Sequence, residues 1–246
     1  MSITTAEELA SMQAAGIVAR QVLEAMKRQV RPGITTAELD AIGNRVMAEN
    51  GAHSAPAMVY RFPGGSCISV NDEVVHGIPS DRTLEAGDLV KLDVTIEKNG
   101  FMADTAATVA VGAISEERRK LVQCVERAFA RAMLVARAGF RVFEIGRVVE
   151  REVRRDGFSV VRDLCGHGIG RTIHELPQVP NYPDLGARAV LSEGLVITVE
   201  PIIAAGTGRQ FLAEDGWTVR TADASSAAHY EHTIVITKGV PILLTA

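Results

Sequence analysis

"VKLDVTIEKNGFMADTAATV", residues 90–109, is the stretch that decides the fold. Apolar and polar side chains alternate on both sides of Lys98-Asn99-Gly100, which is typical of two antiparallel strands joined by a tight turn. A turn centred between positions 98 and 99 places Asp93 opposite Asp104, whereas a turn centred on Asn99-Gly100 makes these two residues diagonal neighbours. In either register both carboxylates share one face of the sheet, because side chains repeat every two residues.

Two further acidic residues interrupt apolar strands later in the chain. Glu200 lies within LVITVEPII (195–203), and Glu231 lies within HYEHTIVIT (229–237). The alternative for Asp93 and Asp104 is that both face solvent beside the turn. Acidic residues within apolar strands are expected to be buried, and buried acids are rare unless they are paired or bind a metal. Four such carboxylates carry four negative charges, which two divalent cations would neutralise. Oxygen-rich donors with one imidazole favour Mn, Fe or Co, and Zn is also compatible.

The stretch CGHGIGRTIHELP, residues 165–177, supplies that imidazole. Its glycines are spaced G-x-G-x-G, whereas a dinucleotide-binding loop needs G-x-G-x-x-G at the start of a helix. A plain turn would explain the glycines but not His167 between them. We expect a metal or substrate to approach His167 closely, because the flanking glycines leave little side-chain bulk around it.

Hydrophobic period and capping residues predict four helices and five strands. Helices are expected at 5–27, 35–50, from 115 to just before Gly139, and at 142–155, the first two opening with T-x-x-E capping boxes. Strands are expected at 66–72, 88–96, 101–111, 195–203 and 229–237. Helices interleaved with long hairpins indicate an α+β or mixed α/β fold. No Pro-, Gly- or Ser-rich linker divides the chain, so we expect residues 1–246 to form one domain.

A weak internal repeat relates the two halves of the chain. HGIP (76–79) is similar to HELP (174–177), and LEAG (84–87) is similar to LSEG (191–194). Each of the latter is followed, six residues past its glycine, by a carboxylate, Asp93 or Glu200. Five positions also match at a constant offset of 106: Gly33, Glu38, Leu39, Asn50 and Gly51 with Gly139, Glu144, Ile145, Asp156 and Gly157. The repeat predicts a duplicated helix-and-strand unit with a site where the halves meet.

Composition limits the setting in which the protein acts. The chain is 47% hydrophobic and 23% charged with a net charge of −4 and no basic cluster, so we expect a globular protein without a nucleic-acid partner. Cys67, Cys124 and Cys165 have no C-x-x-C spacing, which favours reduced thiols in the cytoplasm. No leader segment and no apolar run long enough to span a bilayer are visible, so no membrane association is expected.

Taken together, these residues resemble the ligand set of the type I methionine aminopeptidases. The matching motifs extend from about residue 5 to 240: Asp93, Asp104, His167 in GHGIG, Glu200 in VEP, Glu231 in YEHT, His76 in HGIP, His174 in HELP and Trp217 in DGWTV. The resemblance implies the duplicated pita-bread α/β fold, with antiparallel sheets around a central dinuclear metal site. It also implies removal of the N-terminal methionine from nascent proteins and peptides by a monomeric, cytoplasmic hydrolase.

The same resemblance implies a role for each site residue. Two divalent ions would be held by Asp93, Asp104, His167, Glu200 and Glu231, with Asp93 and Glu231 contacting both ions or binding in bidentate fashion. A metal-bridging hydroxide would attack the first peptide bond, and Glu200 would accept and pass on the proton. His174 would contact the scissile carbonyl oxygen, and His76 the leaving amide nitrogen. Phe62, Cys67 and Trp217 would wall the pocket for the first side chain, with core packing as the alternative for Phe62 and Cys67.

Three departures from the family pattern point to an altered first-residue pocket. Ile173 replaces the usual aromatic residue, His229 replaces the usual glutamine, and the segment 53–62 departs from the cysteine and tyrosine that commonly line the pocket. His53 and His232 are expected to have structural or surface roles. Two other functions remain open: a proline-directed aminopeptidase of the same superfamily, which usually carries an additional N-terminal domain, and a non-catalytic pita-bread binding protein, which typically lacks ligands.

Overall fold

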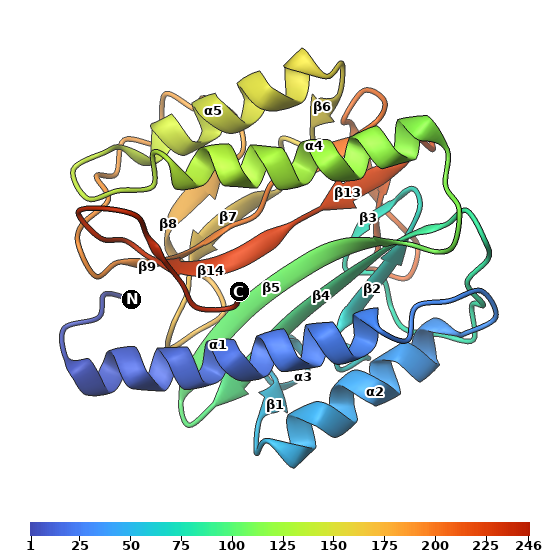
Figure 1. The fold of residues 1–246 in the computed structure, drawn as a ribbon, viewed down its shortest axis with the longest axis horizontal. Helices are drawn as coiled ribbons and strands as arrows, with labels where there is room; N and C mark the ends of the chain where they lie inside the picture. Colours follow the sequence, from blue (N-terminus) through green and yellow to red (C-terminus); the bar gives the residue numbers. More distant parts are fainter.

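Two pairs of helices cover one large sheet in the computed structural model, which describes residues 1–246 (Figure 1). One pair is formed by α1 (Ala6–Lys27) and α2 (Thr36–Glu49), and the other by α4 (Glu116–Met133) and α5 (Val142–Arg155). These four helices confirm the elements predicted from period and caps, although α4 ends at Met133 and not just before Gly139. A short helix, α3 (Ala55–Tyr60), was not predicted. None of the helices is both long and apolar enough to cross a membrane.

The two predicted capping boxes differ in the structure. At α2 the box is complete: Glu38 N–H donates to Thr35 Oγ1 at 3.1 Å, and Thr35 N–H donates to Glu38 Oε2 at 2.8 Å. At α1, Thr5 Oγ1 accepts from Glu8 N–H at 3.2 Å, but the Glu8 carboxylate accepts from Thr4 N–H at 2.8 Å instead of from Thr5. The prediction of a complete capping box at α1 was therefore wrong, because the bond from the Thr5 N–H to the Glu8 carboxylate is not made.

All paired strands are antiparallel. The large sheet has the order β1-β4-β5-β14-β9-β7-β8, with β2 added to β4 and β15 added to β14. Two small sheets, β13-β10-β6 and β11-β12-β3, have three strands each. The strand bounds are β1 (His53–Ser54), β2 (Cys67–Val70), β3 (Glu73–Val75), β4 (Leu89–Lys98), β5 (Phe101–Ala110), β6 (Ser159–Val160), β7 (Cys165–Gly168), β8 (Glu175–Pro180), β9 (Val196–Val199), β10 (Ile202–Ala204), β11 (Gln210–Leu212), β12 (Val219–Thr221), β13 (Ala227–His229), β14 (Glu231–Val235) and β15 (Ile242–Leu243).

The β4–β5 hairpin has the second of the two predicted registers. Asp93 pairs with Ala106 and Thr95 pairs with Asp104, so the two carboxylates are diagonal neighbours on one face. The turn is centred on Asn99 (φ 52°) and Gly100 (φ 79°), both in the left-handed region. Two successive residues with positive φ form the tight turn whose twist matches that of the flanking strands.

The predicted internal duplication is visible in the backbone. α2 and α5 each contain 14 residues. Each is preceded by an isolated β-bridge, Thr35 with Thr83 in the first half and Arg141 with Val190 in the second. Equivalent hydrogen bonds close these corners, from Gly33 N–H to Leu84 O and from Gly139 N–H to Leu191 O, both at 2.9 Å. The sequence repeat therefore corresponds to a repeated helix-and-strand unit.

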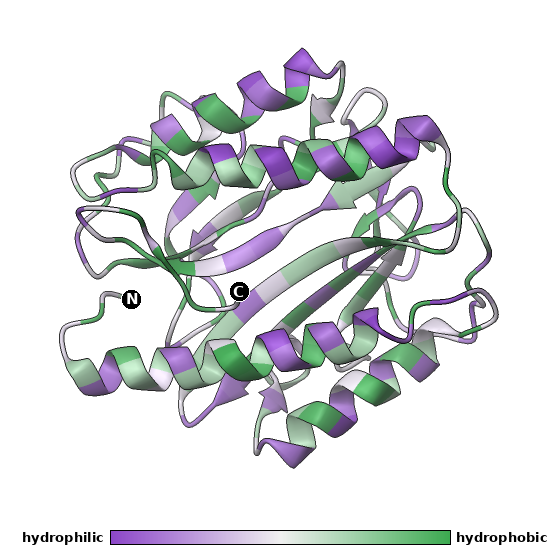
Figure 2. Ribbon diagram, in the orientation of Figure 1, coloured by the Kyte–Doolittle hydropathy of each residue, from purple (hydrophilic) through white to green (hydrophobic).

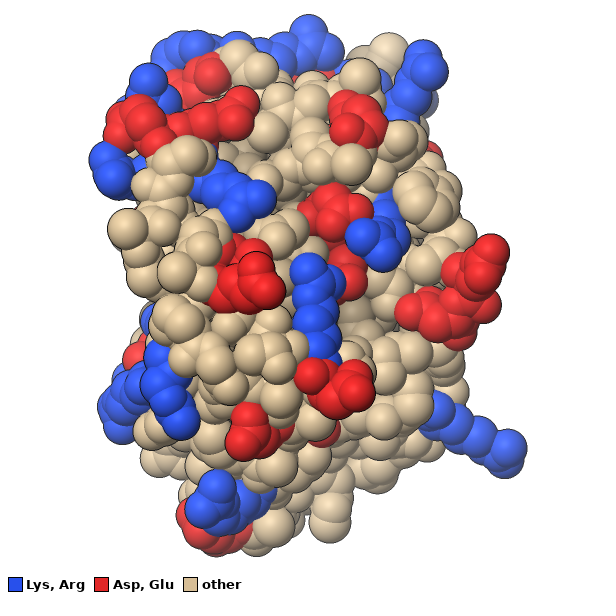
Figure 3. Space-filling view, turned by 90° about the vertical axis from the view of Figure 1, so that its right-hand side faces the viewer, with Lys and Arg blue, Asp and Glu red and all other residues tan.

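Each half has its own hydrophobic core. The larger cluster joins α1 and α2 to β4 and β5, and the second joins α4 and α5 to β9 and β14. In Figure 2 hydrophilic stretches interrupt the central strands β5 and β14, which carry Asp104 and Glu231. On the face in Figure 3, Lys and Arg side chains lie among Asp and Glu side chains, and neither sign forms a continuous patch.

The halves meet along a short seam between β5 and β14. Only two residue pairs, Glu231 with Ala106 and His232 with Thr105, join these strands in register. Threonine hydroxyls extend the seam: Thr105 Oγ1 donates to Glu231 O at 2.9 Å, and Thr233 Oγ1 accepts from Asp104 N–H at 2.9 Å. Thr108 Oγ1 likewise accepts from His229 N–H at 2.8 Å. Side chains therefore replace part of the backbone ladder where the strands separate.

Candidate metal centre

One cleft of about 500 Å³ brings all the predicted site residues together. Residues from both halves line it, since β4 and β5 belong to the first half and β7, β9 and β14 to the second. The predicted residues that line the cleft are Phe62, Cys67, His76, Asp93, Asp104, His167, His174, Glu200, Trp217 and Glu231.

Four carboxylates gather at the bottom of this cleft. Asp104, Glu200 and Glu231 are buried, and Asp93 is half-buried. Burial raises the pKa of all four, and neighbouring carboxylates raise those of Asp93, Glu200 and Glu231 further. Asp104 Oδ1 and Glu231 Oε1 have no hydrogen-bond partner in the protein. Leaving a buried polar group unpaired costs about 1–3 kcal/mol, and more for a charged group, so the cluster requires cationic partners.

His167 is held with one ring nitrogen free for a ligand. Its Nδ1 lies 2.9 Å from Gly168 O, which assigns the proton to Nδ1. Its Nε2 lies 3.5 Å from Glu200 Oε1, and one donor atom each from Asp104, His167 and Glu231 lie within 4.8 Å of one another. Burial lowers the pKa of His167, which keeps the imidazole neutral. A neutral imidazole whose second nitrogen donates to a carbonyl is the usual state of a metal ligand.

The glycines beside His167 have a different role from the one predicted. A Cβ at Gly166 would lie 2.6 Å from Thr198 O on β9, and a Cβ at Gly168 would lie 2.4 Å from Leu176 O on β8. Both distances are shorter than any side-chain contact allows. The glycines therefore permit close packing of β7 between its neighbouring strands, and the expectation that they clear space around the imidazole was wrong.

Thr198 on β9 connects two members of the cluster. Its hydroxyl donates to Glu200 Oε1 at 2.7 Å and accepts from His167 N–H at 3.0 Å. The Glu200 carbonyl in turn accepts from Asn181 Nδ2 at 2.8 Å. Glu200 follows β9 directly, so the Thr198 bond holds its side chain and the Asn181 bond holds its backbone at the end of this strand. Sequence reasoning missed Thr198, whose alternating position predicts only that it shares a face with Glu200.

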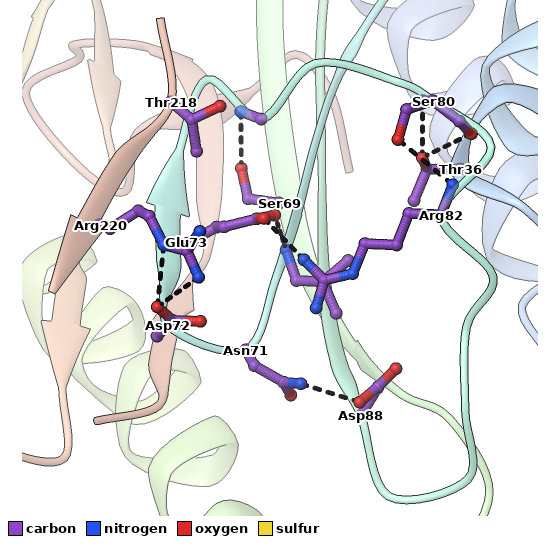
Figure 4. A network of polar contacts seen from close by, with 12 residues as sticks. Thr36, Ser69, Asn71, Asp72, Glu73, Ser80, Arg82, Asp88, Thr218 and Arg220 are labelled. Carbon is purple, nitrogen blue, oxygen red and sulfur yellow. Dashed lines mark hydrogen bonds and ion pairs between the residues drawn. The ribbon is translucent and has the colours of Figure 1, made fainter. Parts of the chain in front are cut away.

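His76 is presented on a strained turn after β3. Its φ of 59° lies in the left-handed region, which a residue other than glycine adopts only when its surroundings hold it there. Figure 4 shows the polar contacts that hold this segment: Arg82 Nη1 donates to Glu73 Oε1 at 2.6 Å, and Arg220 Nε donates to Asp72 Oδ2 at 2.9 Å. Gly77 N–H donates to Ser69 Oγ at 3.0 Å.

His174 faces the cluster from the β7–β8 connection. Its ring packs edge-on against His167 with 4.3 Å between centroids, and its Nδ1 lies 2.6 Å from Tyr60 Oη on α3. Burial lowers the pKa of both His174 and His76, and each pKa is lowered further by a neighbouring histidine. Tyr60 was not predicted as a site residue, because nothing in the sequence shows that α3 and the HELP segment are close.

An aromatic pair forms one wall of the cleft. The rings of Phe62 and Trp217 meet edge to face with 5.3 Å between centroids. Cys67 on β2 pairs with Asp93 on β4, and burial and this carboxylate raise the pKa of its thiol, which favours the neutral form. Ile173 is buried and also lines the cleft.

A second imidazole was predicted only as a departure from the family pattern. His229, at the end of β13, is buried in the cleft with Nε2 3.3 Å from Glu231 Oε2. Burial, together with the nearby His76 and Lys91, lowers its pKa to about 3. His232 points away from the cleft, and its Nδ1 lies 2.9 Å from Thr245 Oγ1. His53 is exposed on β1.

The donor set fits divalent cations. Carboxylate oxygens dominate it, unpaired oxygens point into it, and at least one neutral imidazole has a free lone pair. Similarity to known proteins agrees with this chemistry: residues 10–238 match the model of metallopeptidase family M24. The chain therefore belongs to metallopeptidase family M24.

Within that family the chain belongs to the methionine aminopeptidases. It is 47% identical over 247 residues to methionine aminopeptidase 2 of Bacillus subtilis (strain 168), covering 100% of this chain and 99% of the relative. The methionine aminopeptidase of Escherichia coli (strain K12) is 41% identical, with 100% and 94% covered. The crystal structure of methionine aminopeptidase from Rickettsia prowazekii superposes with a TM-score of 0.96 at 37% identity, covering 100% of both chains. The expected pita-bread fold is confirmed.

Proposed function

We propose that this protein is a metal-dependent aminopeptidase that removes the N-terminal methionine from nascent proteins and peptides. The observation that carries the proposal is the group of four carboxylates and His167 at the bottom of a cleft with an aromatic wall. The names of its relatives support the substrate, and the donor set supports the chemistry. We also propose that residues 1–246 act as one catalytic unit, since both halves contribute donors.

Two divalent ions would be bound by five residues of the cluster, Asp93, Asp104, His167, Glu200 and Glu231. The charge supports this number, because four carboxylates are neutralised by two divalent cations. Bound there, such ions supply an acidified water as nucleophile and polarise the scissile carbonyl. The preference of these donors is for Mn, Fe, Co or Zn.

Glu200 would act as the base. Its Oε1 already accepts a hydrogen bond from Thr198, which orients the carboxylate toward His167 and the cleft. Glu200 also lies within reach of the donor atoms of His229 and Glu231, which places its carboxylate where a water held by the ions would be attacked by a base. It would receive the proton of the attacking water and deliver it to the leaving amine.

The two histidines would bind the peptide. If Tyr60 donates to His174 Nδ1, the His174 Nε2 carries a proton that it can donate to the carbonyl oxygen of the scissile bond. His76, on its strained turn, would contact the amide nitrogen that leaves. Phe62, Cys67 and Trp217 would surround the first side chain, and Ile173 would widen that pocket relative to an aromatic residue.

The test compares hydrolysis of the tripeptide Met-Ala-Ser by protein treated with EDTA and by the same protein resupplied with Mn, Co, Fe or Zn. We expect turnover to vanish with the chelator and to return with at least one ion. Leu-Ala-Ser and norleucine-Ala-Ser measure the pocket, and an Xaa-Pro peptide measures the proline-directed alternative. Faster cleavage of the leucine or the Xaa-Pro peptide would overturn the methionine assignment.

A further inference from the structure

His229 is a buried imidazole whose two ring nitrogens have no hydrogen-bond partner in the protein. The residue is 2% exposed, and it lines the cleft. A neutral imidazole has one N–H donor and one lone pair, and each of these groups is destabilising when it is buried without a partner. The position therefore calls for a partner that the chain itself does not provide.

The backbone holds this imidazole in place. His229 pairs with Ile202 across β13 and β10, and its N–H and C=O both bond to Thr108 Oγ1 at 2.8 Å. Its side chain lines the cleft, with Nε2 beside the Glu231 carboxylate. The ring nitrogens therefore face the donor atoms of the cleft.

The partner can be identified from the atoms that face the ring. His229 Nε2 lies 3.3 Å from Glu231 Oε2, and one donor atom each from Glu200, His229 and Glu231 lie within 4.8 Å of one another. The other close group of donors is Asp104, His167 and Glu231. The two groups share Glu231, so one carboxylate lies between two sets of donors, each of which contains an imidazole.

We propose that His229 Nε2 is a direct ligand of one of the two divalent ions, together with Glu200 and Glu231. The inference rests on the proposed metal centre and adds a sixth donor residue to the five expected ones. Each ion then has an imidazole, His167 for one and His229 for the other. Imidazole suits Zn, Fe and Cu better than Mn or Mg, so His229 shifts the preference of its ion away from Mn.

The two imidazoles differ in the hydrogen bond made by the nitrogen that does not face the metal site. His167 Nδ1 has an acceptor in Gly168 O, whereas His229 Nδ1 has none. An acceptor that holds the second ring nitrogen of a metal-binding histidine contributes about 10- to 100-fold to metal affinity. The ion at His229 is therefore the more weakly bound of the two, and binding occurs in two separable steps.

The experiment counts the imidazoles bound to cobalt. Each histidine ligand of Co(II) gives a strongly shifted, exchangeable N–H signal in the proton NMR spectrum. We expect two such signals from the wild-type protein. His229→Gln should keep only the signal of His167, and His167→Gln should keep only the signal of His229. The control His53→Gln should keep both signals, because His53 is exposed on β1. Calorimetric titration of His229→Gln should show at least a tenfold loss of Co(II) affinity in the weaker step and a smaller loss for Mn(II).

The outcomes separate the inference from the function on which it rests. A single wild-type signal that is lost in His167→Gln but kept in His229→Gln overturns the role of His229 alone. Two shifted signals that are both kept in His167→Gln and both kept in His229→Gln overturn the proposed metal centre itself. X-ray absorption of the cobalt-loaded wild-type protein provides the count without any substitution: one imidazole per two cobalt ions contradicts the proposal, and two support it.

Discussion

Thr198→Val tests whether the hydroxyl on β9 organises the metal centre. Valine has the shape of threonine, and Thr198 is fully buried, so the change removes two hydrogen bonds with little effect on packing. The bond lost to Glu200 Oε1 is 2.7 Å long and involves an ionisable acceptor, and the bond lost from His167 N–H is 3.0 Å long. Both lost bonds belong to proposed metal ligands.

The magnitude follows from these two bonds. A hydrogen bond to a charged group contributes about 1.5–3 kcal/mol, which corresponds to a loss of metal affinity of about 10- to 150-fold. The His167 N–H left without an acceptor costs about 1–3 kcal/mol of folding stability. Loss of metal affinity and loss of stability should therefore appear together.

Calorimetric titration of the metal-free protein with Mn(II) measures the first effect, and urea denaturation in EDTA measures the second. Thr221→Val is the matched control, because Thr221 is also buried and its hydroxyl donates to Ser225 O at 2.8 Å away from the cluster. The control should lose about 0.5–1.5 kcal/mol of stability and keep its metal affinity. If Thr198→Val binds Mn(II) within twofold of the wild type while folded, Thr198 does not position the ligands.

Three further changes test other parts of the structure. Glu200→Gln should abolish turnover and keep the fold. In EDTA, urea denaturation between pH 5 and 8 should also show that the wild type loses stability relative to this variant as the pH rises. The sign follows because burial raises the pKa of Glu200, so the folded chain holds a proton that the unfolded chain releases, and a constant difference would contradict it. Gly168→Ala should lose about 1–3 kcal/mol in urea denaturation, because the added Cβ would lie 2.4 Å from Leu176 O, whereas an unchanged midpoint would show that β7 and β8 can separate. Trp217→Ala should lower kcat/KM for Met-Ala-Ser by about tenfold, mainly through KM, because it opens the wall formed with Phe62; a loss confined to kcat would place Trp217 elsewhere in the reaction.

The sequence predicted the parts of the site that depend on period and local turns. Strand alternation alone places Asp93 and Asp104 on one face, and it leaves open only the choice between two registers. The Asn99-Gly100 turn decides that choice, because both residues adopt positive φ. The four long helices were predictable for the same reason: their apolar faces, and the side-chain caps of α1, α2 and α4, are local properties.

Contacts between distant segments could not be predicted in this way. Tyr60 and His174 are 114 positions apart, and α3 is too short to show a helical period. His229 shares a face with Glu231 two positions on, but its proximity to Glu200 depends on the pairing of β13 with β10, two strands of three residues each. The close approach of β7 to its neighbours, which explains the glycines beside His167, likewise depends on tertiary packing.

The short seam between β5 and β14 has a consequence for how the protein opens. The amide protons of Asp104 and His229 are held by threonine hydroxyls, which are easier to displace than the paired carbonyls of a full ladder. These amides should exchange with solvent earlier than the amides of β4 and β5 that donate to carbonyls of the partner strand. Since Asp104 and His229 lie on opposite sides of the seam, ions bound between them would slow that exchange, and amide protection along the seam would report the occupancy of the centre directly.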